Sequence, residues 1–390
     1  MRIAVVAESF LPQANGVTVT ALRLLEYLDA HGDEVLVLAP APSRGEDAVD
    51  QYAGASVYRF RSVSLPGYAE MRLSNPRVRT LAEHLRYFNP DVVHLAAPFL
   101  LGRQAIGAAQ SLDLPTVAVY QTEVPTYARR YHAKQIESLL WRRIEHIHKR
   151  ATLSLAPSSY ACAQLIERGV HRVAVWPHGV DRDRFDPVYR DEALRATLAG
   201  PGEVIVGYVG RLAREKQVED LAALAYLPNI RVVVVGDGPR REKLAQSLPG
   251  AIFTGHLQGP DLPRMMASFD VFVHTGQMDT FAQTIVEAQA SGVPVVAPAR
   301  GGPLDLVEPG RTGFLYPPDS LPELARHVRT LTEDAGLRLV MGVAARESTA
   351  NRTWEVVNAE ILRHYTNAVT FNLRDRAQRF RPPRRRLLTR

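Results

Sequence analysis

The chain has 390 residues, of which 46% are hydrophobic and 23% are charged. This composition excludes a disordered or fibrous chain, and the length favours two folded domains over one. No apolar run is long enough to cross a bilayer. The single cysteine, Cys162, excludes an intramolecular disulfide. It also fits a reducing compartment, so we expect a cytoplasmic protein.

The net charge of +6 is unevenly distributed along the chain. Residues 371–390 contain eight arginines and one aspartate, so this segment accounts for all of the excess. An arginine-rich tail could bind nucleic acid or a membrane surface. It has no stacking aromatic side chain beyond Phe380. We therefore predict a disordered, solvated tail over 371–390 and no nucleic-acid partner.

The first half of the chain alternates apolar strands with amphipathic helices. Residues 17–32 predict a helix, with Leu24, Leu25 and Leu28 at helical spacing and Gly32 at its end. The predicted strands occupy residues 2–9, 34–40, 91–98, 116–123, 153–158 and 173–179. This alternation predicts a parallel, doubly wound sheet in a first domain over residues 1–185.

The same pattern starts again after a polar segment near residues 180–200. The predicted strands of this second sheet occupy residues 203–210, 231–239, 251–256, 271–276 and 293–299. The fold class is therefore α/β, with a second domain over 186–350 that faces the first across a cleft. In open α/β sheets, ligands bind beyond the carboxyl ends of the strands.

Two carboxylates eight residues apart follow one of these strands. Asp279 is expected in the loop after it, and Glu287 on the next helix. That helix is predicted to begin near Thr280–Phe281, so its first amide groups would face the cleft and suit a phosphate. These amides belong to Thr280, Phe281, Ala282 and Gln283. From the spacing alone, a surface glutamate and a capping aspartate are equally consistent with the pattern.

A second candidate segment, GYVGRLAREKQ, follows the first strand of the second domain. Gly207 and Gly210 would allow close backbone approach, and Arg211 and Lys216 suit a diphosphate. A solvated charged loop is the alternative. In the first domain, Gly16 opens a helix and would let a phosphate approach its first turn, although a plain turn glycine fits as well. Histidines at the strand ends are each more often structural: His94, His178, His256 and His274.

Together these motifs resemble the retaining glycosyltransferases of family 4, from residue 1 to about residue 370. ESFLPQANGV resembles the family's N-terminal donor loop, VGRLAREK its diphosphate motif and DTFAQTIVE its E-x7-E motif, while ASGVPVVAP and GGPLDLV also match. The resemblance implies the GT-B fold, which has two Rossmann-like domains. It also implies a C-terminal helix, expected over 351–370, that crosses back to the first domain.

The resemblance implies specific roles for the candidate residues. Arg211 and Lys216 would bind the diphosphate and stabilise the leaving group, Asp279 would contact the sugar, and Glu287 would bind the ribose. The leaving diphosphate would itself deprotonate the acceptor, so no protein nucleophile is implied. We expect neither a cofactor nor a metal ion, because no HExxH, paired-cysteine or DxD motif is present.

Two positions depart from the family pattern. Asp279 stands where the family usually has glutamate, and Gln121 where many members have a cleft histidine. Gln121 and GGPLDLV look most like the actinobacterial branch that uses GDP-mannose. We therefore expect a hexosyltransferase that moves mannose from GDP-mannose, with Gln121 in the donor site. A UDP-glucose or UDP-N-acetylglucosamine donor is the main alternative, followed by a sugar-nucleotide epimerase.

A basic segment over residues 129–150 bears on the acceptor. It contains seven lysines and arginines against two glutamates and predicts a helix with one apolar side. That side holds Ile136, Leu139, Leu140, Ile144 and Ile147. A helix packed on the core explains this pattern at least as well as a membrane contact. The acceptor could therefore be a membrane glycolipid, with the enzyme peripheral to the inner face of the membrane.

Overall fold

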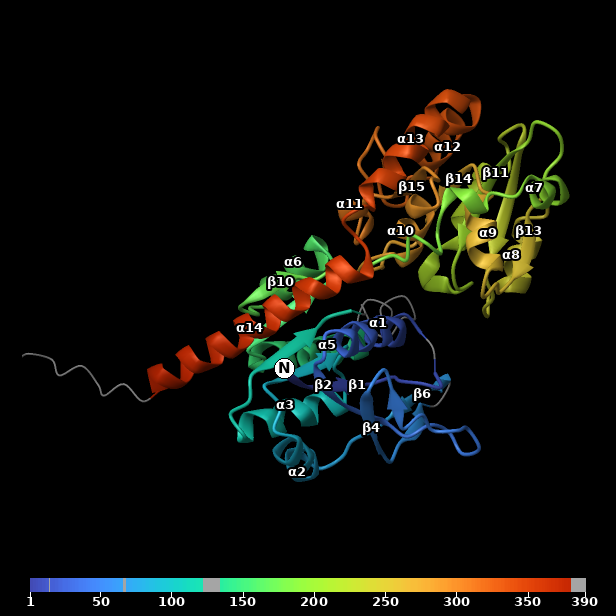
Figure 1. The fold of residues 1–390 in the computed structure, drawn as a ribbon. Helices are drawn as coiled ribbons and strands as arrows, with labels where there is room; N and C mark the ends of the chain where they lie inside the picture. Colours follow the sequence, from blue (N-terminus) through green and yellow to red (C-terminus); the bar gives the residue numbers. More distant parts are fainter. Residues whose placement is uncertain (14, 66–67, 122–133, 380–390) are drawn as a thin grey trace, which may run out of the picture.

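The computed structural model describes residues 1–13, 15–65, 68–121 and 134–379. Figure 1 shows two lobes, each built around its own sheet, with the long last helix running beside the first lobe. We call the sheet of residues 2–175 with its helices the first lobe, and the sheet of residues 204–316 with its helices the second lobe. The expected α/β class with two parallel sheets is confirmed.

The first lobe holds an eight-stranded sheet among the described residues, in the order β10-β9-β8-β7-β1-β2-β4-β3. All its pairs are parallel except β3 with β4. The central strands are buried on both faces, which explains their continuous apolar sequences. Its strands are β1 (Arg2–Ala7), β2 (Glu34–Pro40), β3 (Gln51–Tyr52), β4 (Ala55–Phe60), β7 (Val92–Ala96), β8 (Thr116–Val119), β9 (Leu153–Ala156) and β10 (Val173–Val175), with a separate antiparallel pair, β5 (Val63–Leu65) and β6 (Tyr68–Leu73).

The second lobe holds a six-stranded parallel sheet in the part of the chain that is described, in the order β13-β12-β11-β14-β15-β16. Successive strands are added to one side of β11 up to β13 and to its other side from β14 onwards. The strand order changes side in the same way between β1 and β7 in the first lobe. Its strands are β11 (Val204–Val209), β12 (Ile230–Val235), β13 (Ile252–Gly255), β14 (Val271–Val273), β15 (Val295–Pro298) and β16 (Gly313–Tyr316).

The helices connect these strands and cover the sheets. In the first lobe they are α1 (Gly16–Ala30), α2 (Val78–Phe88), α3 (Leu101–Ser111), α5 (Lys134–Arg150) and α6 (Ser159–Glu167). Those that follow are η1 (Pro187–Tyr189), α7 (Glu192–Leu198), η2 (Arg214–Lys216), η3 (Val218–Leu224), α8 (Arg241–Ser247), α9 (Asp261–Ala267), α10 (Gln283–Ala290), α11 (Pro303–Leu306), α12 (Leu321–Glu333), α13 (Ala335–Ser348) and α14 (Trp354–Arg379). The 3-10 helices carry the label η.

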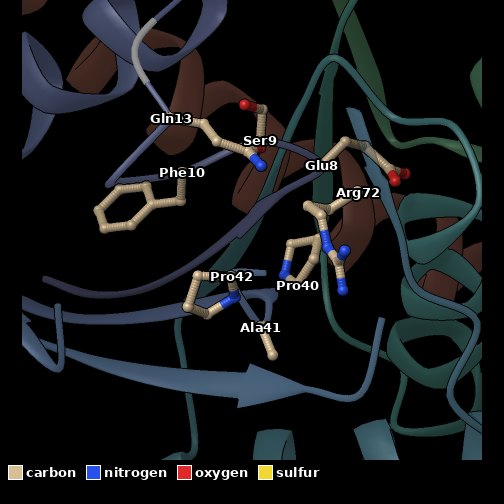
Figure 2. A pocket seen from close by; sticks show the side chains of 8 residues that line it. All are labelled: Glu8, Ser9, Phe10, Gln13, Pro40, Ala41, Pro42 and Arg72. Carbon is tan, nitrogen blue, oxygen red and sulfur yellow. The ribbon is translucent and has the colours of Figure 1, made fainter. Parts of the chain in front are cut away.

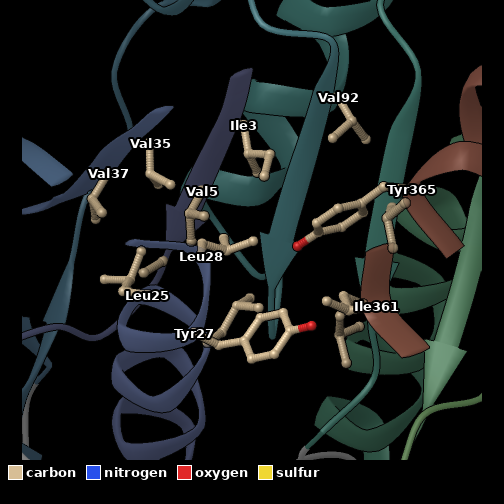
Figure 3. Close-up of a cluster of buried hydrophobic side chains, with 14 of the residues drawn as sticks. Ile3, Val5, Leu25, Tyr27, Leu28, Val35, Val37, Val92, Ile361 and Tyr365 are labelled. Atoms are coloured by element: carbon tan, nitrogen blue, oxygen red, sulfur yellow. The ribbon is translucent and has the colours of Figure 1, made fainter. Parts of the chain in front are cut away.

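Helix α14 is part of the first lobe's core although it follows the second lobe in sequence. Its residues Val357, Ile361, Tyr365 and Ala368 belong to the same buried cluster as strands β1, β2 and β7. Figure 3 shows Ile361 and Tyr365 beside side chains of β1 and α1. The Tyr365 hydroxyl also lies 2.9 Å from His94 Nδ1. The helix therefore ties the end of the chain to the first sheet.

The predicted end of this helix was wrong. The sequence placed a helix over 351–370 and a disordered tail from residue 371, but α14 runs to Arg379. Arg172 donates two hydrogen bonds to Asp375, at 2.8 and 2.7 Å, and Arg376 pairs with Asp113 at 2.5 Å. These ion pairs hold the extra turns on the first lobe, so charge here stabilises a helix. Residues 380–390 lie outside the described part of the chain.

The predicted basic helix corresponds to α5, while residues 129–133 lie outside the described residues. Its apolar side is used mainly within the protein, since Ile144 is 6% exposed and Ile147 is fully buried. Leu139 is instead 59% exposed. Ile144 and Ile147 therefore pack on the core, Leu140 is partly buried, and Leu139 lies on the solvated face. The side chain of Ile136 lies outside the described part of the helix.

Candidate functional site

The candidate site lies at the switch point of the second sheet, between β11 and β14. Loops that follow neighbouring parallel strands diverge at such a point and leave room for a ligand. The loop after β11 carries Arg211, which is exposed, and then forms η2, which ends at Lys216. The loop after β14 carries Asp279. All three residues predicted to be catalytic therefore come from the two loops at this point.

Each carboxylate oxygen of Asp279 faces one other side chain. Lys216 Nζ lies 2.5 Å from Oδ1, and His274 Nε2 lies 3.0 Å from Oδ2. Burial alone would raise the pKa of Asp279, but the positive charge of Lys216 and the contact with His274 outweigh it. They hold the pKa of this carboxyl well below its ordinary value, so it is charged at neutral pH. A sugar hydroxyl at Asp279 would have to share oxygens that already face these two side chains.

The helix that follows begins later than the sequence predicted. Ala282 adopts a left-handed conformation with φ 71°, and α10 starts at Gln283. A non-glycine residue in this region interrupts a right-handed helix. The helix predicted to begin near Thr280–Phe281 therefore begins two residues later, at Gln283. Residues 279–282 instead form an irregular loop between the strand and the helix.

This loop rests on a glycine pair. A Cβ on Gly301 would lie 2.6 Å from Asp279 O, and one on Gly302 would lie 2.1 Å from Phe281 O. Gly302 N donates to Asp279 O at 2.9 Å. Any larger residue at these two positions would push the loop of residues 279–282 outwards. The GGPLDLV segment thus fixes the height of the loop above the sheet.

Glu287 lies in the middle of α10 and is half-buried. Burial raises the pKa of Glu287 to about 7, whereas the charge of Arg184 and a hydrogen bond with Gln283 act in the opposite direction. Gln283 Nε2 also donates to Gly179 O at 3.0 Å, which joins α10 to the segment between the lobes. A ligand that donates hydroxyl hydrogen bonds to Glu287 would stabilise its charged form.

The first lobe meets this loop at Gln121 and contributes Gly16. Gln121 lies two residues after β8 and is 7% exposed, and its main-chain oxygen accepts a hydrogen bond from Thr280 Oγ1 at 2.7 Å. Gly16 begins α1, where Asn15 caps the Thr18 amide at 3.0 Å. A Cβ on Gly16 would meet no atom of the described residues within 4 Å. The first turn of α1 is therefore open to a ligand.

The comparisons with known proteins agree with this arrangement. Residues 14–184 match the family model described as Glycosyltransferase Family 4, and residues 190–348 match the one described as Glycosyl transferases group 1. The GDP-mannose-dependent alpha-mannosyltransferase of Mycolicibacterium smegmatis is 47% identical to this chain, over 94% of this chain and 97% of its own length. The chain belongs to the family-4 glycosyltransferases.

Solved structures show the fold of this glycosyltransferase. Sucrose-phosphate synthase from Thermosynechococcus elongatus has a TM-score of 0.79 at 21% identity and covers 95% of this chain and 99% of its own. HepE from Anabaena, in a complex with UDP-glucose, has a TM-score of 0.75 at 23% identity, over 94% and 100% of the two chains. The GT-B fold, with two Rossmann-like units, is therefore confirmed.

The glycosyltransferase also contains a first-lobe carboxyl group that the sequence did not single out. Glu8 follows β1 and accepts hydrogen bonds from the amides of Phe99 at 2.5 Å, Gly102 at 2.8 Å and Leu101 at 3.2 Å. Burial raises the pKa of Glu8 to about 7, against the lowering effect of these amides and of Arg143. Glu8 anchors the loop that leads to Gly16 and caps α3. Nothing in the sequence before Gly16 distinguishes Glu8 from a solvated glutamate.

A small pocket lies beside Glu8 at the carboxyl end of the first sheet. Figure 2 shows its lining residues: Glu8, Ser9, Phe10, Gln13, Pro40, Ala41, Pro42 and Arg72. Arg59 fixes the loop that forms one wall, because its guanidinium donates to Leu11 O at 2.7 Å and to Pro40 O at 3.1 Å. The pocket therefore has a rigid backbone on the side that leads to the first turn of α1.

Two histidines of the strand ends prove to lie near the site of the glycosyltransferase. His274 contacts Asp279, as described above. The ring of His178 packs on Phe281, with centroids 4.8 Å apart, and burial lowers the pKa of His178 to about 4. Gly207, in contrast, leaves room for the ring of Phe269 and not for a ligand, since a Cβ there would lie 2.1 Å from that ring. Sequence position alone could not separate these cases.

The described residues, 1–13, 15–65, 68–121 and 134–379, contain no helix with the length and apolar character needed to cross a membrane. Within the same ranges, no three histidine, cysteine, aspartate or glutamate side chains converge as metal ligands would. Neither statement extends to the remaining segments of the glycosyltransferase.

Proposed function

We propose that this glycosyltransferase moves a mannosyl group from GDP-mannose to an acceptor hydroxyl, with retention of the anomeric configuration. One observation carries the proposal: the Lys216–Asp279 contact, at 2.5 Å, places a fixed cation at the switch point where a diphosphate would lie. The choice of donor is supported by the 47% identity to a relative named for its dependence on GDP-mannose.

The donor would lie between the two lobes. Arg211 and Lys216 would bind the diphosphate from the second lobe, and Gly16 would offer the open first turn of α1 from the first. Glu287 would accept hydrogen bonds from the ribose hydroxyls. Gln121 and the loop of residues 279–282 would enclose the sugar, with the Thr280 hydroxyl joining the two walls.

The proposed reaction breaks the bond between the anomeric carbon and the diphosphate oxygen. The acceptor oxygen forms the new bond on the same face, and its proton passes to the departing diphosphate. Asp279 does not serve as the nucleophile, because both of its oxygens are held by Lys216 and His274. Gln121 has no titratable group and cannot act as a base. Catalysis then comes from positioning and from the cations of Arg211 and Lys216, and we propose that no metal ion is needed.

A donor panel tests this proposal. A bound donor stabilises the folded state by mass action, so the melting temperature should rise with GDP-mannose more than with equal concentrations of UDP-glucose or UDP-N-acetylglucosamine. A larger rise in melting temperature with either UDP-sugar would identify that sugar nucleotide as the donor in place of GDP-mannose. Nucleotide release that depends on an added acceptor would support transfer, whereas conversion of the sugar nucleotide without acceptor would identify an epimerase.

We infer further that the acceptor is a glycolipid presented at a membrane surface. The support comes from α5, where the exposed Leu139 lies on the same solvated side as the exposed basic residues Arg142 and Lys149. Residues of this kind bind anionic lipid surfaces through charge and a shallow apolar anchor. A helix that is merely solvated on this side is the alternative.

Sedimentation with anionic vesicles separates these two explanations. A chain shortened to residue 379 removes the basic tail and should still bind vesicles at low salt and dissociate at high salt. Arg142→Glu should weaken binding, and Arg86→Glu, on α2 of the same lobe, is the matched control. Equal effects of the two substitutions, or no binding by the shortened chain, would contradict a role for α5.

A further inference from the structure

We propose that His274 is a positioning residue of the transferase site. It holds one oxygen of Asp279 in place, so that the other oxygen fixes Lys216 where the donor diphosphate binds. His274 touches no reacting atom in this scheme and acts through Asp279 and Lys216. The inference rests on the proposed function only in assigning Lys216 to the diphosphate.

The contacts form a continuous series of three side chains. His274 Nε2 lies 3.0 Å from Asp279 Oδ2, and Lys216 Nζ lies 2.5 Å from Asp279 Oδ1. His274 is 3% exposed and Asp279 is 9% exposed, so water does not compete strongly for either group. A carboxylate held on both oxygens cannot rotate without breaking one contact. The direction of the Lys216 side chain is therefore coupled to His274.

The main chain around these residues is fixed as well. His274 N donates to Val296 O at 2.9 Å, which places the histidine at the end of the sheet. The next residue, Thr275, donates from its hydroxyl to Lys216 O at 2.6 Å. Lys216 is thus tied to the β14 loop twice, through its backbone by Thr275 and through its side chain by Asp279. The two loops at the switch point behave as one unit.

The turn between His274 and Asp279 leaves space for this pair and for nothing more. A Cβ on Gly276 would lie 2.7 Å from Asp279 Oδ2 and 3.1 Å from His274 Nε2. Any side chain at this position would push into the contact. His274 Nδ1, His274 Nε2 and Asp279 Oδ2 are all buried, and none of them has a partner in hydrogen-bond geometry among the described residues. The polar group that the imidazole ring approaches is the Asp279 carboxylate, whose Oδ2 lies 3.0 Å from Nε2.

These observations explain how an aspartate can serve where the family usually has a longer glutamate. The short side chain reaches Lys216 with one oxygen while His274 lies beside the other, and in this proposal the pairing sets the orientation of the carboxylate. A donor diphosphate would draw Lys216 towards itself. With His274 still bound to Oδ2, Asp279 would stay in place and keep the cation aligned during the reaction. Small displacements of such a group lower rates by up to about a hundredfold.

Three substitutions at His274 test this role in the full-length chain. Gln places an amide N–H close to the position of Nε2, Asn places it one carbon short, and Leu removes it. We expect His274→Leu and His274→Asn to lower kcat about tenfold to a hundredfold, with little change in the KM for the acceptor. His274→Gln should recover most of the lost rate. Melting temperatures with and without donor show whether each variant is folded.

A double-mutant cycle with Lys216→Ala gives the decisive reading. Because His274 acts through Lys216, adding His274→Leu to Lys216→Ala should cause little further loss of kcat. Equal losses in both backgrounds, or equal rates for the Gln and Leu variants, would overturn the inference while leaving the proposed function intact. A parent-like rate in Lys216→Ala alone would instead remove the proposed diphosphate role of Lys216, and the inference with it.

Discussion

Each sheet has a buried or partly buried carboxyl side chain at its switch point, and these two, Glu8 and Asp279, have opposite kinds of partner. Glu8, after β1, accepts main-chain N–H groups from the loop before α3 and from its first turn. Asp279, after β14, faces the side chains of Lys216 and His274. Burial dominates at the first and raises the pKa of Glu8 to about 7. Cationic and imidazole partners dominate at the second and lower the pKa of Asp279.

The difference indicates a division of labour between the lobes. Amides of the main chain cannot move towards a ligand, so Glu8 makes a rigid support for the loop that ends at Gly16. A lysine side chain can move, so the Lys216–Asp279 pair can share its positive charge with a bound diphosphate. We infer that the first lobe supplies shape to the donor site and the second lobe supplies the charge that changes during the reaction.

Removing the positive charge of Lys216 should have the largest effect. Lys216→Ala leaves Asp279 with His274 alone and takes one cation from the diphosphate. By comparison with the loss of one oxyanion donor, the transition state should lose about 3–4 kcal/mol of stabilisation, and kcat/KM should fall accordingly. Arg211→Ala should also lower the rate, because its guanidinium lies in the same loop. Steady-state kinetics with GDP-mannose would measure both losses.

Arg214→Ala is the matched control for these two variants. It removes a cation from η2, the same short helix that ends at Lys216, and leaves both proposed diphosphate ligands in the chain. Its rate should stay within a few-fold of the parent. If all three substitutions reduced kcat/KM equally, net charge in the loop would explain the loss and no individual diphosphate contact would be needed.

The opposite pKa shifts predict opposite effects of pH on stability. Glu8 has a raised pKa of about 7 against an ordinary value of 4.5, so between these values the folded state keeps a proton that the unfolded state has lost. The free energy of unfolding should therefore fall as pH rises through this window, by roughly 2–3 kcal/mol. Glu287 has the same shift and should act in the same direction. Stability from Asp279 is instead lost only in acid.

Denaturant titrations from pH 4 to 8 would measure this effect. Glu8→Gln and Glu287→Gln should each remove part of the slope, because neither amide titrates. Glu34→Gln, at an exposed strand end, is the control. A parent protein whose unfolding free energy does not decrease over this range would show that the two carboxyls are already charged, and the contrast with Asp279 would disappear.

Lengthening the carboxylate side chain tests how tightly the second switch point is packed. Asp279→Glu must fit its extra carbon between Lys216, His274 and the turn at Gly276, where a Cβ would already lie 2.7 Å from Oδ2. We expect one of the two contacts to be lost, which costs roughly 1.5–3 kcal/mol for a charge-assisted hydrogen bond. Donor affinity, measured by calorimetry, should fall. Tighter donor binding would instead show that the site is loosely packed and that the Asp279 side chain is too short to contact the sugar directly.

Much of the fold could be predicted because its strands are buried runs of valine, isoleucine and leucine. The sequence located the inner strands of both sheets, including β1, β7 and β11. It missed β16, since GFLY is short and begins with a glycine, and it missed the short strands β3 to β6. It also ended α14 too early, because Asp375 and Arg376, in the segment predicted to be a solvated tail, form ion pairs with Arg172 and Asp113, far away in the sequence.

The candidate site was predicted in its residues but not in its geometry. Motif resemblance pointed to Lys216, Asp279 and Glu287, all of which lie at or near the second switch point. It could not show that His274 contacts Asp279, because a histidine after a strand is common and the contact depends on a tight turn at Gly276. Nor could it foresee the left-handed Ala282, which delays α10. Both features are set by packing against distant segments.

The smallest predicted effect concerns the hydrogen bond between Thr280 and Gln121, which joins the two walls of the proposed sugar site. Thr280→Val keeps the shape of the side chain but removes the hydroxyl that donates to Gln121 O at 2.7 Å. A neutral hydrogen bond of this kind contributes about 1 kcal/mol, so the KM for the donor should rise by roughly fivefold with little change in kcat. Thr284→Val, one turn away on α10, is the matched control. If the two lobes close on the donor independently of this bond, both variants will have the parent's KM, and the two walls are joined by the ligand itself.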